Sequence, residues 1–99
     1  MEGYATSVFT DEAIDWISAQ EQPWFLWLAY TAPHPPYHLP PSDLHTQQEL
    51  TGSEEDIASN SLPYYLAMME AMDSELGRLL ASLSNTERDN TIVIFVGDN

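Results

Sequence analysis

Two apolar segments separated by a long helical pattern constrain the fold of this chain most strongly. Residues 24–30 (WFLWLAY) are continuously apolar and rich in aromatic side chains, and residues 91–96 (TIVIFV) are rich in β-branched ones. The first segment lacks the strict alternation of a strand with one exposed face, which predicts a strand covered on both faces, as in a parallel sheet. Because β-branched side chains favour strands, we predict a second buried strand over residues 91–96.

The pattern between the two predicted strands indicates a helix over residues 61–84. Ser61 can cap this helix, and Pro63 falls in its first turn, where a missing N–H group costs nothing. Glu75 and Arg78 fall largely outside an apolar stripe that recurs with the period of one helix face. The stripe consists of Leu62, Tyr65, Leu66, Met69, Met72, Leu76, Leu79, Leu80 and Leu83.

A shorter helix is predicted over residues 11–19. Thr10 is a suitable N-cap, and Asp11 and Glu12 place negative charge in the first turn, where the helix dipole favours it. Its apolar stripe consists of Phe9, Ala13, Trp16 and Ile17.

Residues 31–60 form a long connection between the first strand and the long helix. Its start is rich in proline, which excludes a helix and a central strand there. The rest is polar and acidic, with a turn expected at Gly52 and Ser53. A connection of this length is uncommon in a compact domain and is more often functional than idle.

The order strand, loop, helix, strand is that of a βαβ crossover. If the two strands share a sheet, they run parallel through a right-handed crossover, and their carboxyl ends lie on the same edge. His34 follows the first strand, and Asp98 and Asn99 follow the second. Open α/β sheets bind ligands at that edge. We therefore expect His34, Asp98 and Asn99 to project into one region.

Asp98 and Asn99 have the chemistry of metal ligands. A carboxylate and an amide carbonyl are hard oxygen donors, which suit calcium or magnesium. Gly97 gives the backbone the freedom to turn both side chains toward one ion. Taken without context, the pair is also explained by a polar turn after a strand.

His34 lies between prolines that hold the backbone extended and stiff. An imidazole at a sheet edge can bind an oxyanion or donate a proton near neutral pH. A surface histidine in a proline-rich turn is the alternative explanation. His38 and His45 are interpreted as solvated loop histidines.

The charge of the chain excludes two classes of partner. Lysine is absent, two arginines face sixteen carboxylates, and the formal net charge is −14. Nucleic acids and anionic membrane surfaces would be repelled. An anionic substrate is still compatible, because a bound divalent metal can reverse the local potential. Cysteine is absent, so we expect no disulfide or thiol chemistry, and no apolar run is long enough to span a bilayer.

Three ordered segments resemble one family, the sulfatases of the alkaline phosphatase superfamily. Residues 23–36 resemble the family segment PFFLYLAYxAPHxP, residues 65–80 its helix YxAMVExxDxxxGRLL, and residues 90–99 its segment NTIVIFTSDNG. The resemblance covers nearly the whole chain in the right order. The fold it implies is α/β, namely the βαβ portion of a mixed, mainly parallel sheet flanked by helices, alkaline-phosphatase-like and incomplete.

The resemblance implies an enzyme that cleaves sulfate esters, of a small molecule or a glycan, with calcium and a formylglycine nucleophile. Asp98 and Asn99 correspond to two calcium ligands, and His34 corresponds to the catalytic and substrate-binding histidine that contacts the sulfate group. The nucleophile motif and the other metal ligands have no counterparts here. Residues 1–99 are therefore expected to be a single internal fragment of a sulfatase catalytic domain, inactive without its remainder. Family members are often exported, but the sequence itself does not indicate a compartment.

Two alternative functions stay open at this point. Phosphonate and phosphate-ester hydrolases of the same superfamily commonly carry histidine where this chain has Asn99, so asparagine favours a sulfatase. The second alternative is a non-catalytic module that keeps the sulfatase architecture and only binds or packs.

Overall fold

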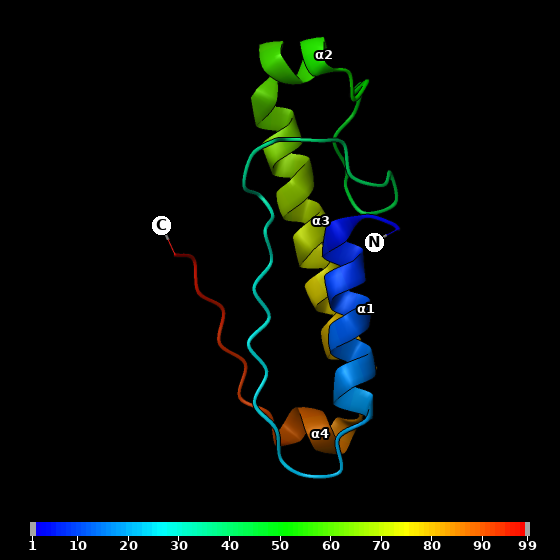
Figure 1. Ribbon diagram of the computed structural model, residues 1–99, viewed down its shortest axis with the longest axis vertical. Helices are drawn as coiled ribbons and strands as arrows, with labels where there is room; N and C mark the ends of the chain where they lie inside the picture. The colour runs from blue at the N-terminus through cyan, green and yellow to red at the C-terminus, as the bar shows by residue number, and fades with distance from the viewer. Residues whose placement is uncertain (1, 99) are drawn as a thin grey trace.

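The computed structural model describes residues 2–98 and contains four helices in that range: α1 (Ala5–Ser18), α2 (Glu54–Ser59), α3 (Ser61–Ser82) and α4 (Asn85–Asp89). The molecule is elongated, measuring 49 × 28 × 22 Å along its principal axes. The long helix α3 follows the longest axis with α1 beside it, while α2 and α4 lie at opposite ends (Figure 1). None of the helices in residues 2–98 combines the length and apolar composition needed to cross a bilayer.

The core lies between α1 and α3. Ala13 and Ile17 of α1 form a buried cluster with Leu79 of α3 and with Leu83, which follows its end. The other buried apolar positions of α3 recur every three or four residues, as expected for one helix face. They are Tyr64, Ala67, Met68, Ala71 and Met72. The predicted long helix is thus confirmed, although it ends at Ser82, and Asn60 rather than Ser61 occupies the N-cap position.

The buried face of α3 differs from the predicted apolar stripe. Leu62 is 64% exposed, and Tyr65 and Leu66 are 36% and 40% exposed. Glu75, by contrast, is only 4% exposed. Ala67 and Ala71 lie on the covered face together with Met68 and Met72, which places Tyr65 and Leu66 on the outer side of the helix. The helical period was correctly inferred, and Met72, Leu79 and Leu83 of the predicted stripe are buried. The stripe was wrong over the first turns of the helix, because alanine carries little weight in a hydrophobic pattern.

Glu75 is buried because it joins α3 to α1. Its carboxylate accepts a hydrogen bond from Ser7 Oγ at 3.0 Å, and from Nε and Nη2 of Arg78 at 2.9 and 2.6 Å. Arg78 Nη1 also forms an ion pair with Asp11 at 2.7 Å. A buried carboxylate requires such partners, because leaving it unpaired away from water is costly.

The first helix begins six residues before the predicted start. Thr10, predicted as its N-cap, is fully buried inside the helix. Its hydroxyl donates to the carbonyl of Thr6 at 2.9 Å and lies 2.6 Å from the hydroxyl of Tyr30. This tertiary contact satisfies a side chain that would otherwise favour a helix terminus.

Two short helices, α2 and α4, were not predicted. The side chain of Ser53 accepts a hydrogen bond from the backbone of Asp56 and caps α2. Ser84 and Glu87 form a reciprocal capping box at α4. Both capping patterns are visible in the sequence, and helices of five and six residues fall below the length that a periodic pattern can identify.

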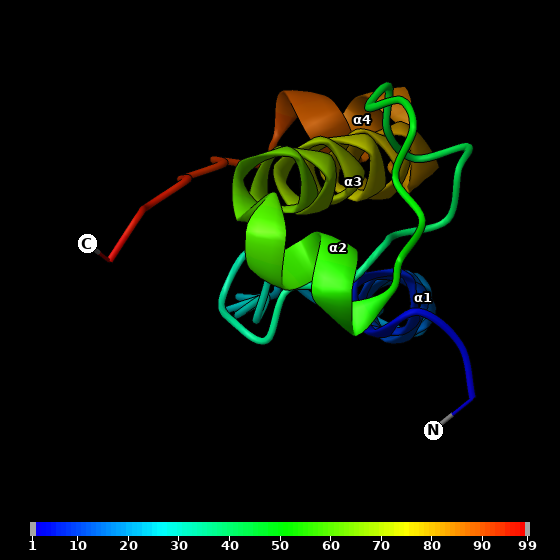
Figure 2. The same ribbon diagram turned by 90° about the horizontal axis from the view of Figure 1, so that it is seen from above.

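The predicted βαβ portion of a mixed, mainly parallel α/β sheet is wrong for the described range, residues 2–98. No residue there forms a strand, and no backbone hydrogen bond joins residues 24–30 to residues 92–98. A strand requires a hydrogen-bonded ladder to a neighbour, and these extended segments provide none to each other. They run in the same direction from the end that holds α4, but the C-terminal one diverges from the helices (Figures 1 and 2).

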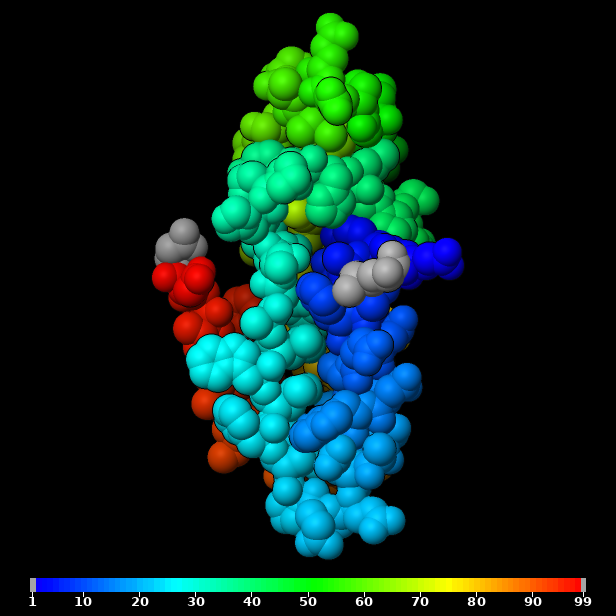
Figure 3. Space-filling view, viewed as in Figure 1, coloured from blue at the N-terminus to red at the C-terminus, as the bar shows by residue number. Residues whose placement is uncertain are grey.

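Residues 24–30 instead pack one of their two faces on the helices. Trp24, Leu26 and Leu28 lie against the core cluster, whereas Phe25 and Trp27 are each 81% exposed. The space-filling view shows this segment lying along α1, with the C-terminal segment on the flank of the molecule (Figure 3). Residues 24–30 are therefore not a strand covered on both faces, as was expected, but an extended segment covered on one face.

The exposed segment 92–96 predicts self-association of the 99-residue chain. All five residues are large and apolar, and Ile92 is 89% exposed. An apolar patch of this kind promotes contacts between copies. We expect the weight-average mass from light scattering to rise with concentration at 0.15 M salt, where charge repulsion is screened over about 8 Å. Ile94→Asp should reduce the rise, whereas Leu62→Asp, at an exposed position elsewhere, should not. A monomer at every concentration would contradict this prediction.

Candidate functional site

His34 is an exposed residue in the turn that follows the extended segment 24–30. Its backbone N–H donates to the carbonyl of Thr31 at 2.8 Å, which closes the turn. Its ring nitrogen Nδ1 lies 2.6 Å from the carbonyl oxygen of Pro35. A carbonyl oxygen only accepts, so Nδ1 carries a hydrogen and Nε2 is the nitrogen left for a ligand.

Asp98 is exposed in the C-terminal segment, and Asn99 lies outside the described residues. Within residues 2–98 no three histidine, cysteine, aspartate or glutamate side chains gather closely enough to hold a metal ion. Neither a hydrogen bond nor an ion pair joins His34 to Asp98 in that range. The expected meeting of His34, Asp98 and Asn99 at one sheet edge stays a prediction.

Three side chains of α3 form hydrogen bonds with the connection that follows His34, namely Tyr64, Glu70 and Ser74. The hydroxyl of the fully buried Tyr64 donates to the carboxylate of Asp56 and accepts from the N–H of Gly52 at 2.9 Å. Glu70 accepts from the backbone N–H of Thr46 at 2.5 Å and from Gln47 Nε2 at 2.6 Å. The turn predicted at Gly52 and Ser53 is not formed, although Gly52 has a positive φ of 77° that suits glycine.

Three hydrogen-bonded carboxylates make the fold sensitive to acid. The Tyr64 hydroxyl lowers the pKa of Asp56, the Gln47 amide lowers the pKa of Glu70, and the Ser84 backbone lowers the pKa of Glu87. A pKa that is lower in the folded state gives stability that is present above the unfolded-state pKa and is lost as pH falls through the folded-state value. We expect the urea midpoint to fall below about pH 4. Glu70→Gln should reduce the fall of the urea midpoint between pH 6 and pH 3. Equal midpoints of the unchanged chain at these two pH values would contradict the prediction.

His45 was interpreted as a solvated loop histidine, and this is wrong. Both of its ring nitrogens are buried, and neither has a hydrogen-bond partner among the described residues. The ring lines a half-open cavity of about 280 Å³ in the connection between His34 and α2. No motif in the sequence marks this position. His38, by contrast, is exposed as expected, with its ring edge-on to Tyr4.

Comparison with known proteins identifies the family. The family model described as Sulfatase matches residues 2–99. The chain belongs to the sulfatase family. It is 40% identical to the uncharacterized sulfatase YdeN of Escherichia coli (strain K12) over 98% of the chain. It is 27% identical to an arylsulfatase of Klebsiella aerogenes over 97% of the chain, and no solved structure matches it significantly.

This sulfatase chain spans 17% of the length of YdeN and 30% of the length of the Klebsiella arylsulfatase. A third relative, the uncharacterized sulfatase PB10D8.02c of Schizosaccharomyces pombe, is 25% identical, and the chain spans 26% of its length. The resemblance found in the sequence is thus confirmed at the level of the family.

Proposed function

We propose that this chain is part of a hydrolase that cleaves sulfate esters with the help of a divalent metal. The observation that carries the proposal is a family match over residues 2–99 in which His34 is presented on an exposed, hydrogen-bonded turn. The substrate would be a sulfated small molecule or glycan.

In the proposed reaction, His34 contacts the sulfate group. The Pro35 carbonyl fixes the hydrogen of the ring on Nδ1, so Nε2 donates to an oxyanion only when the ring is doubly protonated. In that state His34 carries a positive charge in a chain of formal net charge −14, which offsets the repulsion of an anionic ester. A preorganised donor aimed at a developing oxyanion contributes roughly 3 kcal/mol to transition-state stabilisation.

The metal would be calcium, with Asp98 and Asn99 as two of its ligands. The donor set fits, because a carboxylate and an amide carbonyl are both hard oxygen ligands. When bound, the ion would supply positive charge that polarises the sulfate. Asp98 is solvent-exposed, so its carboxylate is accessible to a cation, but two ligands alone bind calcium weakly.

The nucleophile would be a formylglycine supplied by residues outside this chain. The 99 residues contain no cysteine, and a Cys/Ser-x-Pro-x-Arg motif is absent from them. We therefore propose that the chain by itself is inactive and that the remainder of the catalytic domain completes the site.

A comparison of three substrates tests this function. The complete enzyme should hydrolyse 4-nitrophenyl sulfate with a kcat/KM well above that for 4-nitrophenyl phosphate or for a phenylphosphonate monoester. A preference for either phosphorus ester would support the phosphoryl-transfer alternative. Hydrolysis of none of the three by metal-replete protein would support the non-catalytic module.

A further inference from the structure

The turn that presents His34 begins directly after Tyr30, the last residue of the extended segment 24–30. The carbonyl of Thr31 accepts the N–H of His34 at 2.8 Å, so the turn starts one residue beyond Tyr30. His34 itself is exposed, and its ring contacts the carbonyl of Pro35, its neighbour in the chain. The place of the His34 ring in the molecule therefore depends on how the residues on either side of the turn are attached.

Tyr30 joins the start of this turn to the interior of α1. Its hydroxyl oxygen lies 2.6 Å from Oγ1 of Thr10, which is fully buried. The Thr10 hydroxyl donates its only hydrogen to the carbonyl of Thr6 at 2.9 Å. Thr10 Oγ1 therefore accepts the second hydrogen bond, and the Tyr30 hydroxyl is the donor. The end of the extended segment is thus bonded to a buried atom of a helix.

The part of α1 that carries Thr10 is itself held on α3. Ser7 Oγ donates to the buried carboxylate of Glu75 at 3.0 Å, and Nη2 of Arg78 donates to the carbonyl of Ser7 at 3.3 Å. Burial is the main cause that raises the pKa of Tyr30, and the charge of Glu75 raises it further, so the hydroxyl keeps its hydrogen near neutral pH. The acceptor on Thr10 is therefore a fixed point that two helices support.

The far side of the turn is attached more loosely. The ring of Tyr37 lies edge-on to Tyr65 of α3, with 6.1 Å between the ring centroids. Aromatic pairs tolerate centroid separations of about 4.5–7 Å, whereas a hydrogen bond weakens steeply when its geometry changes. Of these two attachments, the Tyr30 hydroxyl therefore restrains the turn more tightly.

We propose that Tyr30 is a positioning residue for His34 and acts through its hydrogen bond to Thr10. The inference rests on the proposed function, in which His34 contacts the sulfate group. Holding the turn at its first residue narrows the range of positions that the exposed ring samples. A donor aimed at an oxyanion acts only from a narrow range of positions, and a misplacement of about 1 Å can lower a rate by about 100-fold. Phenylalanine would pack in the same place, so the hydroxyl is the part of Tyr30 that this role requires.

Ring-nitrogen spectra of His34 test the positioning without requiring activity. In the complete protein labelled with ¹⁵N-histidine, the His34 signals are those that disappear in His34→Gln. Spectra at about pH 8 show a neutral imidazole, and the Pro35 carbonyl holds its hydrogen on Nδ1, which gives a distinct pair of ¹⁵N shifts. Tyr30→Phe should move this pair toward the shifts of a free histidine peptide, in which both tautomers interchange.

Tyr37→Phe is the matched control for these spectra. It removes a tyrosine hydroxyl on the other side of the turn and keeps the ring that contacts Tyr65. The His34 shifts should stay at the parent values in this variant. His34 shifts that are unchanged in Tyr30→Phe, or that move equally in both variants, would overturn the proposal.

Steady-state kinetics on 4-nitrophenyl sulfate show whether the effect reaches the reaction. Tyr30→Phe should lower kcat of the complete enzyme by about 10-fold and change KM by less than about twofold, because the positioned donor serves the transition state. Thr10→Val, which removes the acceptor, should reproduce this loss. Thr10→Ser, which keeps the hydroxyl, should stay within about threefold of the parent kcat. Equal rates in Thr10→Val and Thr10→Ser would contradict a role for the hydrogen bond.

A His34→Gln background shows whether Tyr30 acts through His34. In that background Tyr30→Phe should lower kcat by less than about twofold, because there is no imidazole left to position. A loss of the same size with and without His34 would overturn the proposal. If the complete protein hydrolysed no sulfate ester, the proposed function would fail, and the ring spectra would still decide whether Tyr30 positions His34.

Discussion

Asp98→Ala is expected to lower kcat/KM of the complete enzyme for an aryl sulfate by about 100-fold or more. Asp98 is the only proposed metal ligand of this chain with a carboxylate, so its removal takes a full negative charge from the site. It is also exposed in the structure, and the substitution should leave the packing of α1 and α3 unchanged. The loss should therefore appear in metal content and in catalysis, but not in thermal stability.

Calcium content by atomic emission and the melting temperature distinguish these effects. Asp89→Ala is the matched control, since Asp89 is an exposed aspartate at the end of α4. It should retain both the metal and the activity. If Asp98→Ala kept its calcium and its rate, the assignment of Asp98 as a ligand would be wrong. Loss of activity together with a collapsed melting temperature would indicate a folding defect and contradict the expected result.

Tyr64→Ala is expected to lower the free energy of unfolding of the chain by about 3–5 kcal/mol. Tyr64 is fully buried, so truncation leaves a cavity in the covered face of α3. It also removes the hydroxyl that joins Asp56 and the N–H of Gly52 to that helix. The connection that contains His45 would lose one of its hydrogen-bonded attachments to α3.

Tyr64→Phe separates packing from hydrogen bonding. It keeps the ring and should cost about 1–3 kcal/mol, because the Gly52 N–H loses its partner and the Asp56 carboxylate loses one of its three donors. Urea unfolding gives both values, and hydrogen exchange of the Gly52 amide should quicken in the Phe variant. Tyr65→Phe is the control, as Tyr65 is exposed beside Tyr37 and should change stability by less than about 0.5 kcal/mol. A cost in Tyr64→Phe equal to that of the control would contradict the role of the hydroxyl.

The helices could be predicted from the sequence as far as local pattern determines them. The period of α3 was evident, but its buried face was predicted only from Met72 onward, because Ala67 and Ala71 on the covered side carry little hydrophobic signal. The start of α1 depends on Thr10 meeting Tyr30, a contact between residues twenty positions apart. Such tertiary contacts override capping preferences and leave no trace in a local window.

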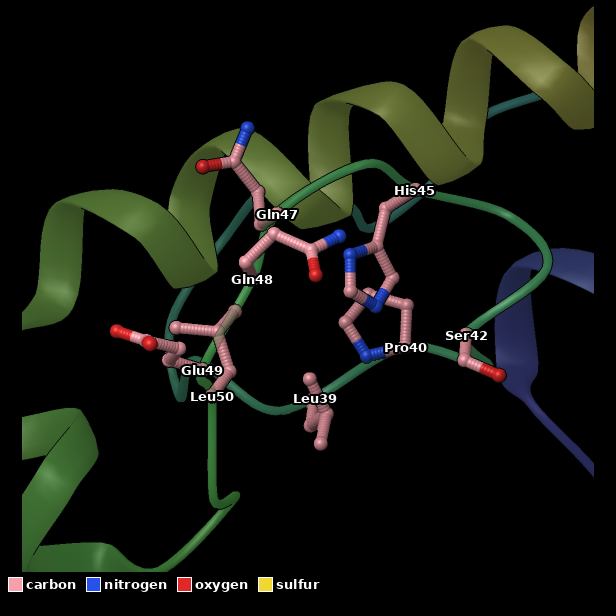
Figure 4. A pocket seen from close by; sticks show the side chains of 8 residues that line it. All are labelled: Leu39, Pro40, Ser42, His45, Gln47, Gln48, Glu49 and Leu50. Carbon is pink, nitrogen blue, oxygen red and sulfur yellow. The ribbon is translucent and has the colours of Figure 1, made fainter.

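The sheet and the site could not be predicted fully from the sequence for a different reason. Apolar, β-branched composition predicted a buried strand over residues 91–96, but a strand also needs a partner, and the described residues supply none. His34 was found through its proline-flanked segment. The burial of the His45 ring nitrogens depends on the folded path of residues 39–50 (Figure 4), which no spacing rule encodes.

The central claim is that His34 and Asp98, far apart in the chain, serve one sulfate-ester site. A double-mutant cycle on kcat/KM for an aryl sulfate tests it directly, using His34→Gln, Asp98→Asn and the double variant of the complete enzyme. Residues that act on one transition state are strongly non-additive, so the double variant should be no more than about threefold slower than the worse single variant. Losses that simply multiply in the double variant would show two independent sites and contradict the claim.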